Sequence, residues 1–129
     1  MTVYFDTSAI LKLALYERET DRLRQFLGGL LDSGLSPATS WLGETEFHRG
    51  AMRKGVGPGP SAEILADFDV YDVPKETFES ASRLPVRELR TLDALHIAIA
   101  LRARAESFVT YDQRQGEAAA SLGLRVVIP

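Results

Sequence analysis

Two aspartates each follow a short apolar run that is typical of a β-strand. Asp6 follows residues 3–5 (VYF), and Asp112 follows residues 108–111 (FVTY). In a sheet whose strands alternate with helices, functional groups gather beyond the carboxyl ends of the strands, so this position suits a reactive carboxylate. A short polar side chain there can equally serve as a helix N-cap. The sequence leaves both roles open for each aspartate.

Two further acids lie within helical patterns. Asp93 interrupts residues 91–104, which are otherwise almost entirely apolar, and an unpaired buried carboxylate is costly. It could instead lie in the first turn of that helix, where the macrodipole favours acids. Glu46 lies on a helix that we predict to begin at Ser40. Because Glu44 is two residues earlier, it lies on a different face, and only one of the two glutamates readily faces a given pocket.

These acids would converge if the strands before Asp6 and Asp112 are neighbours in the sheet. Carboxylates gathered in this way raise one another's pKa unless cations neutralise them. The chain has no cysteine, so it has no thiolate ligand to offer a metal. Carboxylate oxygens are hard ligands that favour Mg²⁺, with Mn²⁺ as a substitute. Such a site suits phosphodiester hydrolysis by two metal ions about 3.5–4 Å apart, which needs no protein nucleophile. The metal ligands that we predict are Asp6, Glu46, Asp93 and Asp112.

The convergence of these acids depends on alternating strands and helices. Apolar, β-prone runs predict strands at about 3–5, 35–38, 68–73, 108–111 and 124–128, the second compatible with a sheet edge. Helical spacing predicts helices at about 10–15, 19–31, 40–55, 62–66, 74–84, 91–104 and 112–122, with a loop at 55–60. This alternation predicts an α/β fold with a central, mostly parallel sheet of four or five strands that is covered on both faces.

The composition indicates one globular domain, residues 1–129. Hydrophobic residues make up 45% and charged residues 26%, an ordinary globular mixture. The net charge of −3 argues against a protein that coats nucleic acid through a broad basic field, but it leaves a local nuclease site open. No apolar run approaches the roughly 20 residues that cross a bilayer, and the N-terminus shows no signal-peptide pattern. We therefore expect a cytoplasmic protein.

Four segments, in this order and spacing, resemble those of VapC toxins of the PIN-domain ribonuclease family. They are residues 3–9 (VYFDTSA), 40–49 (SWLGETEFHR), 92–96 (LDALH) and 108–112 (FVTYD). The resemblance spans essentially the whole chain and implies a PIN-like three-layer α/β/α sandwich. It implies a catalytic metal site in which a hydroxyl supports the acids, formed by Asp6, Glu46, Asp93, Asp112 and Thr110. The spacing of Ser40, Glu46 and Arg49 selects Glu46 over Glu44, and Glu117 is a further acid that could assist.

The resemblance also implies a function and partners. It implies the toxin of a type II toxin–antitoxin system, a Mg²⁺- or Mn²⁺-dependent endoribonuclease that cleaves single-stranded or structured RNA. A homodimer is implied, together with a cognate VapB-type antitoxin that forms a heterotetramer or larger complex with it. Candidates for contacts with RNA phosphates are Lys12, Arg49 and Arg114, each of which could equally be an ordinary surface charge. His96, three residues after Asp93, could touch the site but is better interpreted as a hydrogen-bonded structural histidine, and Trp41 as a residue of the core or of a dimer surface.

Three other functions compete with this interpretation. A receiver-type signalling domain needs an acidic pair around the first strand and a late lysine, whereas Asp6 has no acidic neighbour and no lysine follows Lys75. A haloacid-dehalogenase-type phosphatase would have a second aspartate where Ser8 stands. A PIN-like module that binds RNA or a partner without cutting is the third, and the complete set of acids argues against it.

Overall fold

The computed structural model describes residues 1–129 and contains one sheet of five strands, all of them parallel. The strands are β1 (Thr2–Phe5), β2 (Ser36–Ser40), β3 (Asp69–Tyr71), β4 (Ser107–Val109) and β5 (Val126–Val127). Their order is β3-β2-β1-β4-β5, so the chain begins in the centre of the sheet and builds outward on both sides. The prediction of an α/β fold with a parallel sheet is confirmed.

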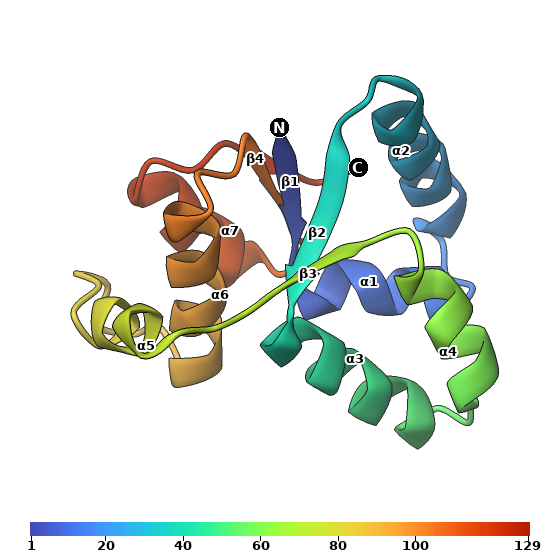
Figure 1. The fold of residues 1–129 in the computed structure, drawn as a ribbon, viewed down its shortest axis with the longest axis horizontal. Helices are drawn as coiled ribbons and strands as arrows, with labels where there is room; N and C mark the ends of the chain where they lie inside the picture. The colour runs from blue at the N-terminus through green and yellow to red at the C-terminus, as the bar shows by residue number, and fades with distance from the viewer.

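Helices cover both faces of the sheet and make a three-layer sandwich. They are α1 (Thr7–Ala14), α2 (Thr20–Asp32), α3 (Trp41–Arg53), α4 (Pro58–Leu65), α5 (Lys75–Ser82), α6 (Thr91–Arg102) and α7 (Gln113–Ser121). Helices α1 to α4 lie on one side of the strands and α5 to α7 on the other (Figure 1). None of these helices has the length and apolar character needed to span a membrane.

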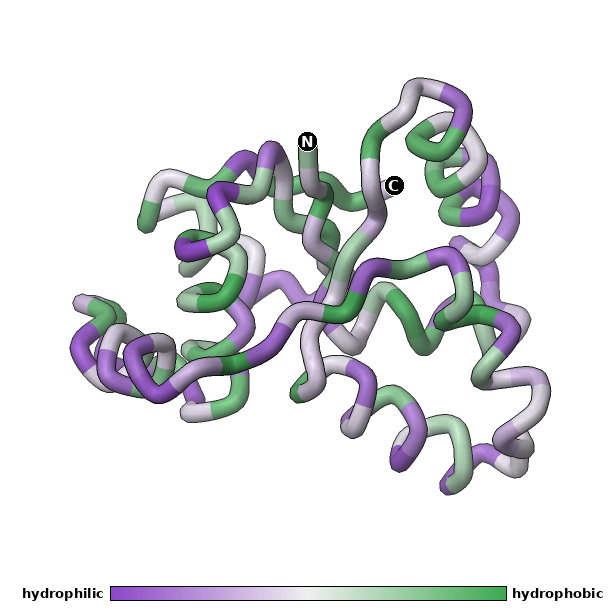
Figure 2. Tube along the Cα trace, in the orientation of Figure 1, coloured by the Kyte–Doolittle hydropathy of each residue, from purple (hydrophilic) through white to green (hydrophobic).

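The central strand β1 supplies side chains to two separate cores, because successive residues of a strand point to opposite faces. Val3 and Phe5 pack in the core beneath α1 and α2, whereas Tyr4 packs with Ile97 and Phe108 in the core beneath α6 and α7. Figure 2 shows hydrophobic and hydrophilic segments alternating along α2 and α3, as expected for helices with one apolar face. β1 is therefore buried on both faces.

The structure differs from the predicted elements at two prolines. Residues 55–60 are not all loop, because α4 begins at Pro58, where the first helical turn needs no backbone N–H from proline. The strand containing Pro37 is an inner strand rather than an edge strand. The N–H of Ser36 points to β1, so the missing N–H of Pro37 is on the side of β3, which pairs only from Ala38 onward. Neither proline therefore removes a hydrogen bond that the fold needs.

The sheet places the residues that follow β1 and β4 side by side. Phe5 is in register with Val109, and the N–H of Asp6 extends the ladder by donating to the Val109 carbonyl at 3.1 Å. The two strands that precede Asp6 and Asp112 are therefore neighbours, as the convergence of the acids requires.

Candidate active site

Asp6 is held in a buried corner at the carboxyl end of β1. Its Oδ1 accepts hydrogen bonds from the Ala9 amide (3.1 Å) and the Ser8 hydroxyl (2.6 Å), and its Oδ2 accepts one from the Thr110 hydroxyl (2.5 Å). Only 4% of Asp6 is exposed. Burial raises the pKa of Asp6 above its ordinary value, although the two hydroxyl donors oppose this effect. A positive charge beside Asp6 would therefore stabilise its ionised form.

Thr110 links this corner to Asp112. Its Oγ1 donates to Asp6 and accepts from the Asp112 amide at 3.0 Å. Asp112 Oδ1 accepts from the Gln115 amide at 3.0 Å and caps α7, just as Asp6 caps α1. The cap and the site roles are compatible, because capping uses only one carboxylate oxygen and leaves further lone pairs free.

Glu46 projects from α3, which begins directly after β2. Its Oε1 accepts hydrogen bonds from the Thr7 hydroxyl at 2.7 Å and from His96 Nε2 at 2.6 Å. Desolvation alone would raise the pKa of Glu46, but the hydrogen bonds from His96 and Thr7 and the electrostatic interaction with His96 lower it below its ordinary value. The prediction that every acid of the site would have a raised pKa is therefore wrong for Glu46.

Asp93 lies in the first turn of α6 and is partly buried. Its pKa is raised, first by desolvation and then by the negative charges of Asp112 and Glu46, while His96 and Arg90 oppose the shift. Asp93 is therefore close enough to Asp112 and Glu46 for their charges to act on it. The fold thus brings the acids that follow β1 and β4, together with those on α3 and α6, to one end of the sheet.

The donors at this end of the sheet fit a hard divalent cation. They are carboxylate and hydroxyl oxygens without a thiol, the set that Mg²⁺ and Mn²⁺ prefer. Burial raises the pKa of Asp6 and of Asp93, and a cation beside these carboxylates would favour their ionised forms. No three of the acid and histidine side chains already enclose a point where a metal could bind. Mg²⁺ usually keeps several waters and binds through one or two carboxylates, so these acids need not enclose it completely.

The two other glutamates considered from the sequence do not join this network. Glu44 lies in the first turn of α3 and makes no side-chain hydrogen bond. Glu117 is exposed on α7 and accepts a hydrogen bond from Gln113 at 3.1 Å. The geometry favours Glu46 over both.

The three basic candidates differ in their surroundings. Lys12 pairs with Glu17 (2.8 Å) and Glu19 (3.1 Å). Its Nζ also lies 4.9 Å from the centre of the ring of Tyr111, the residue before Asp112. Arg49 and Arg114 are exposed and form no ion pair. Both arginines are thus open to a phosphate, whereas Lys12 would first have to leave its acidic partners.

The structure adds polar partners to the acids, one of which the sequence suggested only as an alternative. His96 is only 2% exposed and bonds both Glu46 and the Tyr4 hydroxyl, so it is hydrogen-bonded as expected but also belongs to the site. Thr7 and Ser8 were not predicted as site residues, and their hydroxyls bind Glu46 and Asp6. The sequence signal for these residues is a pair of hydroxyls directly after a strand. Trp41 is not a core residue, since 59% of it is exposed.

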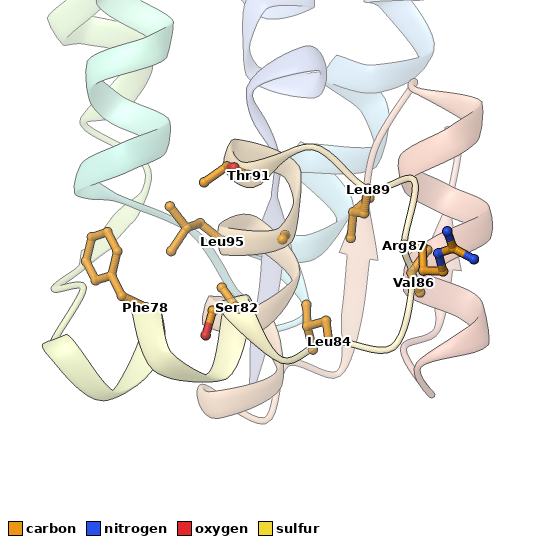
Figure 3. Close-up of a pocket in the computed structure, with 10 residues that line it drawn as sticks. Phe78, Ser82, Leu84, Val86, Arg87, Leu89, Thr91 and Leu95 are labelled. Atoms are coloured by element: carbon orange, nitrogen blue, oxygen red, sulfur yellow. The ribbon is translucent and has the colours of Figure 1, made fainter.

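A separate pocket of about 350 Å³ lies between α5, the segment before α6, and α6. Its lining is mainly apolar and includes Phe78, Leu84 and Leu95, whereas Arg87 points away from these side chains (Figure 3). None of the four acids lines this pocket. The candidate chemistry therefore lies at the end of the sheet and not in this hollow.

Comparison with known proteins agrees with this architecture. Residues 3–121 match the PIN domain family. The chain is 37% identical to ribonuclease VapC46 of Mycobacterium tuberculosis over 98% of this chain and 97% of that protein. The chain is therefore a PIN-domain protein. Within that fold family, it belongs to the VapC ribonucleases.

Two solved structures share the fold at low sequence identity. One is VapC20 of Mycobacterium tuberculosis, described as a toxin that cleaves the sarcin-ricin loop, with a TM-score of 0.74 at 19% identity over 98% of this chain and 99% of that chain. The other is VapBC2 of Rickettsia felis bound to promoter DNA, with a TM-score of 0.79 at 15% identity over 98% of both chains. Both likenesses confirm the three-layer PIN fold.

Proposed function

We propose that this chain is a Mg²⁺-dependent endoribonuclease, with Mn²⁺ as a substitute, and the toxin of a type II toxin–antitoxin pair. Its substrate is single-stranded or structured RNA, which it cuts by two-metal-ion hydrolysis. The observation that carries this proposal is the gathering of Asp6, Glu46, Asp93 and Asp112 at the carboxyl ends of the central strands, in a chain that belongs to the VapC ribonucleases.

The acids and their neighbours have distinct roles in this proposal. The four carboxylates would hold the cations, and the Thr110 and Ser8 hydroxyls keep Asp6 oriented. Bound divalent cations lower the pKa of water and offset the charge on the leaving oxygen. No side chain of the site needs to act as a nucleophile. RNA phosphates would contact Arg49 and Arg114, with Lys12 as a third contact.

The proposed partners follow from the relatives. VapBC2 of Rickettsia felis is a complex bound to a DNA fragment from its own promoter. By analogy, we infer that a VapB-type antitoxin binds this chain, and that the toxin is a homodimer that forms a heterotetramer or larger complex with it. Because its substrate would be cellular RNA, the protein would act in the cytoplasm.

Metal titration against RNA tests the catalytic proposal. Purified chain should cleave a single-stranded or structured RNA only when Mg²⁺ or Mn²⁺ is added, and EDTA should stop the reaction. Hydrolysis by an activated water should leave a 5′-phosphate and a free 3′-hydroxyl. Cyclic phosphate ends formed in EDTA would instead show attack by the RNA 2′-hydroxyl and would refute the mechanism. Binding of RNA with no cutting at any metal concentration would favour a non-catalytic PIN-like module.

A further inference from the structure

The two oxygens of Glu46 have different surroundings. Oε1 accepts two hydrogen bonds, from the Thr7 hydroxyl at 2.7 Å and from His96 Nε2 at 2.6 Å. Oε2 accepts no hydrogen bond from any protein group. Since the donors come from α1 and α6 while Glu46 is on α3, the carboxylate is fixed by two other elements. One oxygen is therefore occupied by protein and the other is free.

The imidazole that holds Glu46 is itself fixed. A carboxylate only accepts hydrogen bonds, so His96 Nε2 carries the proton of that bond. The Tyr4 hydroxyl lies 2.7 Å from Nδ1 and 2.9 Å from Ser40 Oγ. The ring is therefore held by Glu46 at Nε2 and by the Tyr4 hydroxyl at Nδ1. The ring orientation is thereby determined from both sides.

The hydrogen bonds continue from Tyr4 on β1 to Ser40, which caps α3. Ser40 can donate to Tyr4 while its Oγ accepts from the Gly43 amide at 3.2 Å. Glycine at position 43 lets α3 lie close to Thr39 and His96, because a Cβ at that position would overlap the Thr39 side chain and touch the His96 ring. The same short stretch of α3 therefore both anchors the hydrogen-bond chain and carries Glu46, one turn further on.

We propose that His96 is a positioning residue that holds Glu46 by Oε1, so that Glu46 presents only Oε2 to a divalent cation. Tyr4 is the residue that fixes His96 in turn. This role rests on the proposed metal-dependent function. It adds to that function two buried residues, Tyr4 and His96, that hold one of the metal ligands from behind. Partners that orient a metal ligand from behind commonly change metal affinity by about 10- to 100-fold when they are removed.

Direct measurement of Mn²⁺ affinity, by electron paramagnetic resonance of the purified chain with Mn²⁺ alone, tests this role without RNA. His96→Leu should raise the Kd for Mn²⁺ by about 10- to 100-fold. His96→Gln should recover part of that loss, because its amide can donate to Oε1. His48→Leu is the matched control, since His48 is a partly buried histidine on α3 that contacts none of the acids. An H96L protein that folds cooperatively and binds Mn²⁺ like wild type overturns the proposal.

A second pair of variants applies if His96→Leu does not fold. Tyr4→Phe removes only the hydroxyl that fixes His96, and Tyr71→Phe removes a hydroxyl that bonds Thr2 at 2.6 Å, at the opposite end of β1. Weaker Mn²⁺ binding by Tyr4→Phe than by Tyr71→Phe supports the role, and equal binding overturns it.

Kinetics in RNA cleavage give a further readout. Because His96 acts through Glu46, kcat should fall in His96→Leu while KM for RNA changes little. The effect of His96→Leu on Mn²⁺ affinity should disappear in a Glu46→Gln background, since the two residues act as one unit. Additive effects would overturn the positioning role. A wild-type chain that binds Mn²⁺ but cuts no RNA would refute the ribonuclease proposal, and the Mn²⁺ comparison would still decide the role of His96.

Discussion

Asp6 and Glu46 lie at the same end of the sheet, yet the protein surrounds their carboxylates differently. Asp6 is almost fully buried and receives hydrogen bonds only from hydroxyl and amide donors, and its pKa is raised. Glu46 is less buried and receives a hydrogen bond from a histidine, and its pKa is lowered. At Asp6 the deeper burial outweighs the hydrogen bonds and the influence of His96, whereas at Glu46 the hydrogen bonds from His96 and Thr7 outweigh a smaller desolvation.

The largest expected effect is at Asp6, the acid that depends most on an added cation. Asp6→Asn should reduce RNA cleavage by more than about 100-fold, beyond the loss typical of groups that only support a metal ligand. The fold should persist, because asparagine has nearly the same volume and its Oδ1 can still cap α1. Cleavage assays and circular dichroism check both parts. Normal turnover by this variant would remove Asp6 from the mechanism.

Glu46 should show a similar loss, and Glu44 provides its control. Glu46→Gln removes the charge that His96 and Thr7 hold in place, whereas Glu44→Gln changes a residue without a side-chain hydrogen bond. Cleavage should therefore be nearly lost in Glu46→Gln and close to wild type in Glu44→Gln. The reverse result would show that Glu44 is the ligand and that our choice between the two is wrong.

The support of Asp6 by Thr110 should matter less than the acid itself. Thr110→Val removes the donor to Asp6 and the acceptor of the Asp112 amide. Loss of these buried partners should lower the free energy of unfolding by about 1–3 kcal/mol, measured by urea denaturation. Cleavage should fall by about 10- to 100-fold. Thr110→Ser keeps the hydroxyl and should restore both properties, and a Ser variant as poor as Val would contradict the hydrogen-bond explanation.

The smallest effects are changes in stability with pH, and they should have opposite signs at the two acids. The folded-state pKa of Asp6 is above its unfolded value, so between these values the folded state binds more protons and the free energy of unfolding falls as pH rises. The folded-state pKa of Glu46 is below its unfolded value, so its contribution is present above the unfolded value and is lost as pH falls through the folded one.

Unfolding of the metal-free protein at a series of pH values measures this difference. At neutral pH, Asp6→Asn should raise the free energy of unfolding, because it removes a buried charge. Glu46→Gln should lower it, because it removes a favourably paired one. Shifts of the same sign in both variants would show that the surroundings of the two acids are alike in their effect on charge.

Much of the fold could be predicted from the sequence, because its signals are local. The alternation of apolar runs predicted all five strands and their parallel arrangement, and the hydroxyl and acidic residues after the strands predicted the caps. Two proline-containing segments were interpreted too simply. Whether Pro37 loses a hydrogen bond depends on where β3 begins, and whether Pro58 ends or begins a helix depends on its position in the first turn.

The sequence by itself determined which acids are available and which strands precede Asp6 and Asp112. Only the tertiary structure decided how each acid is held. Thr110 and Asp6 are 104 residues apart in the chain, and His96 and Glu46 are 50 apart, yet each pair is in hydrogen-bond contact. Strand and helix patterns arise from neighbours in the chain, whereas the pKa of a carboxylate depends on the groups that the fold places against it, and here those groups are distant in the chain.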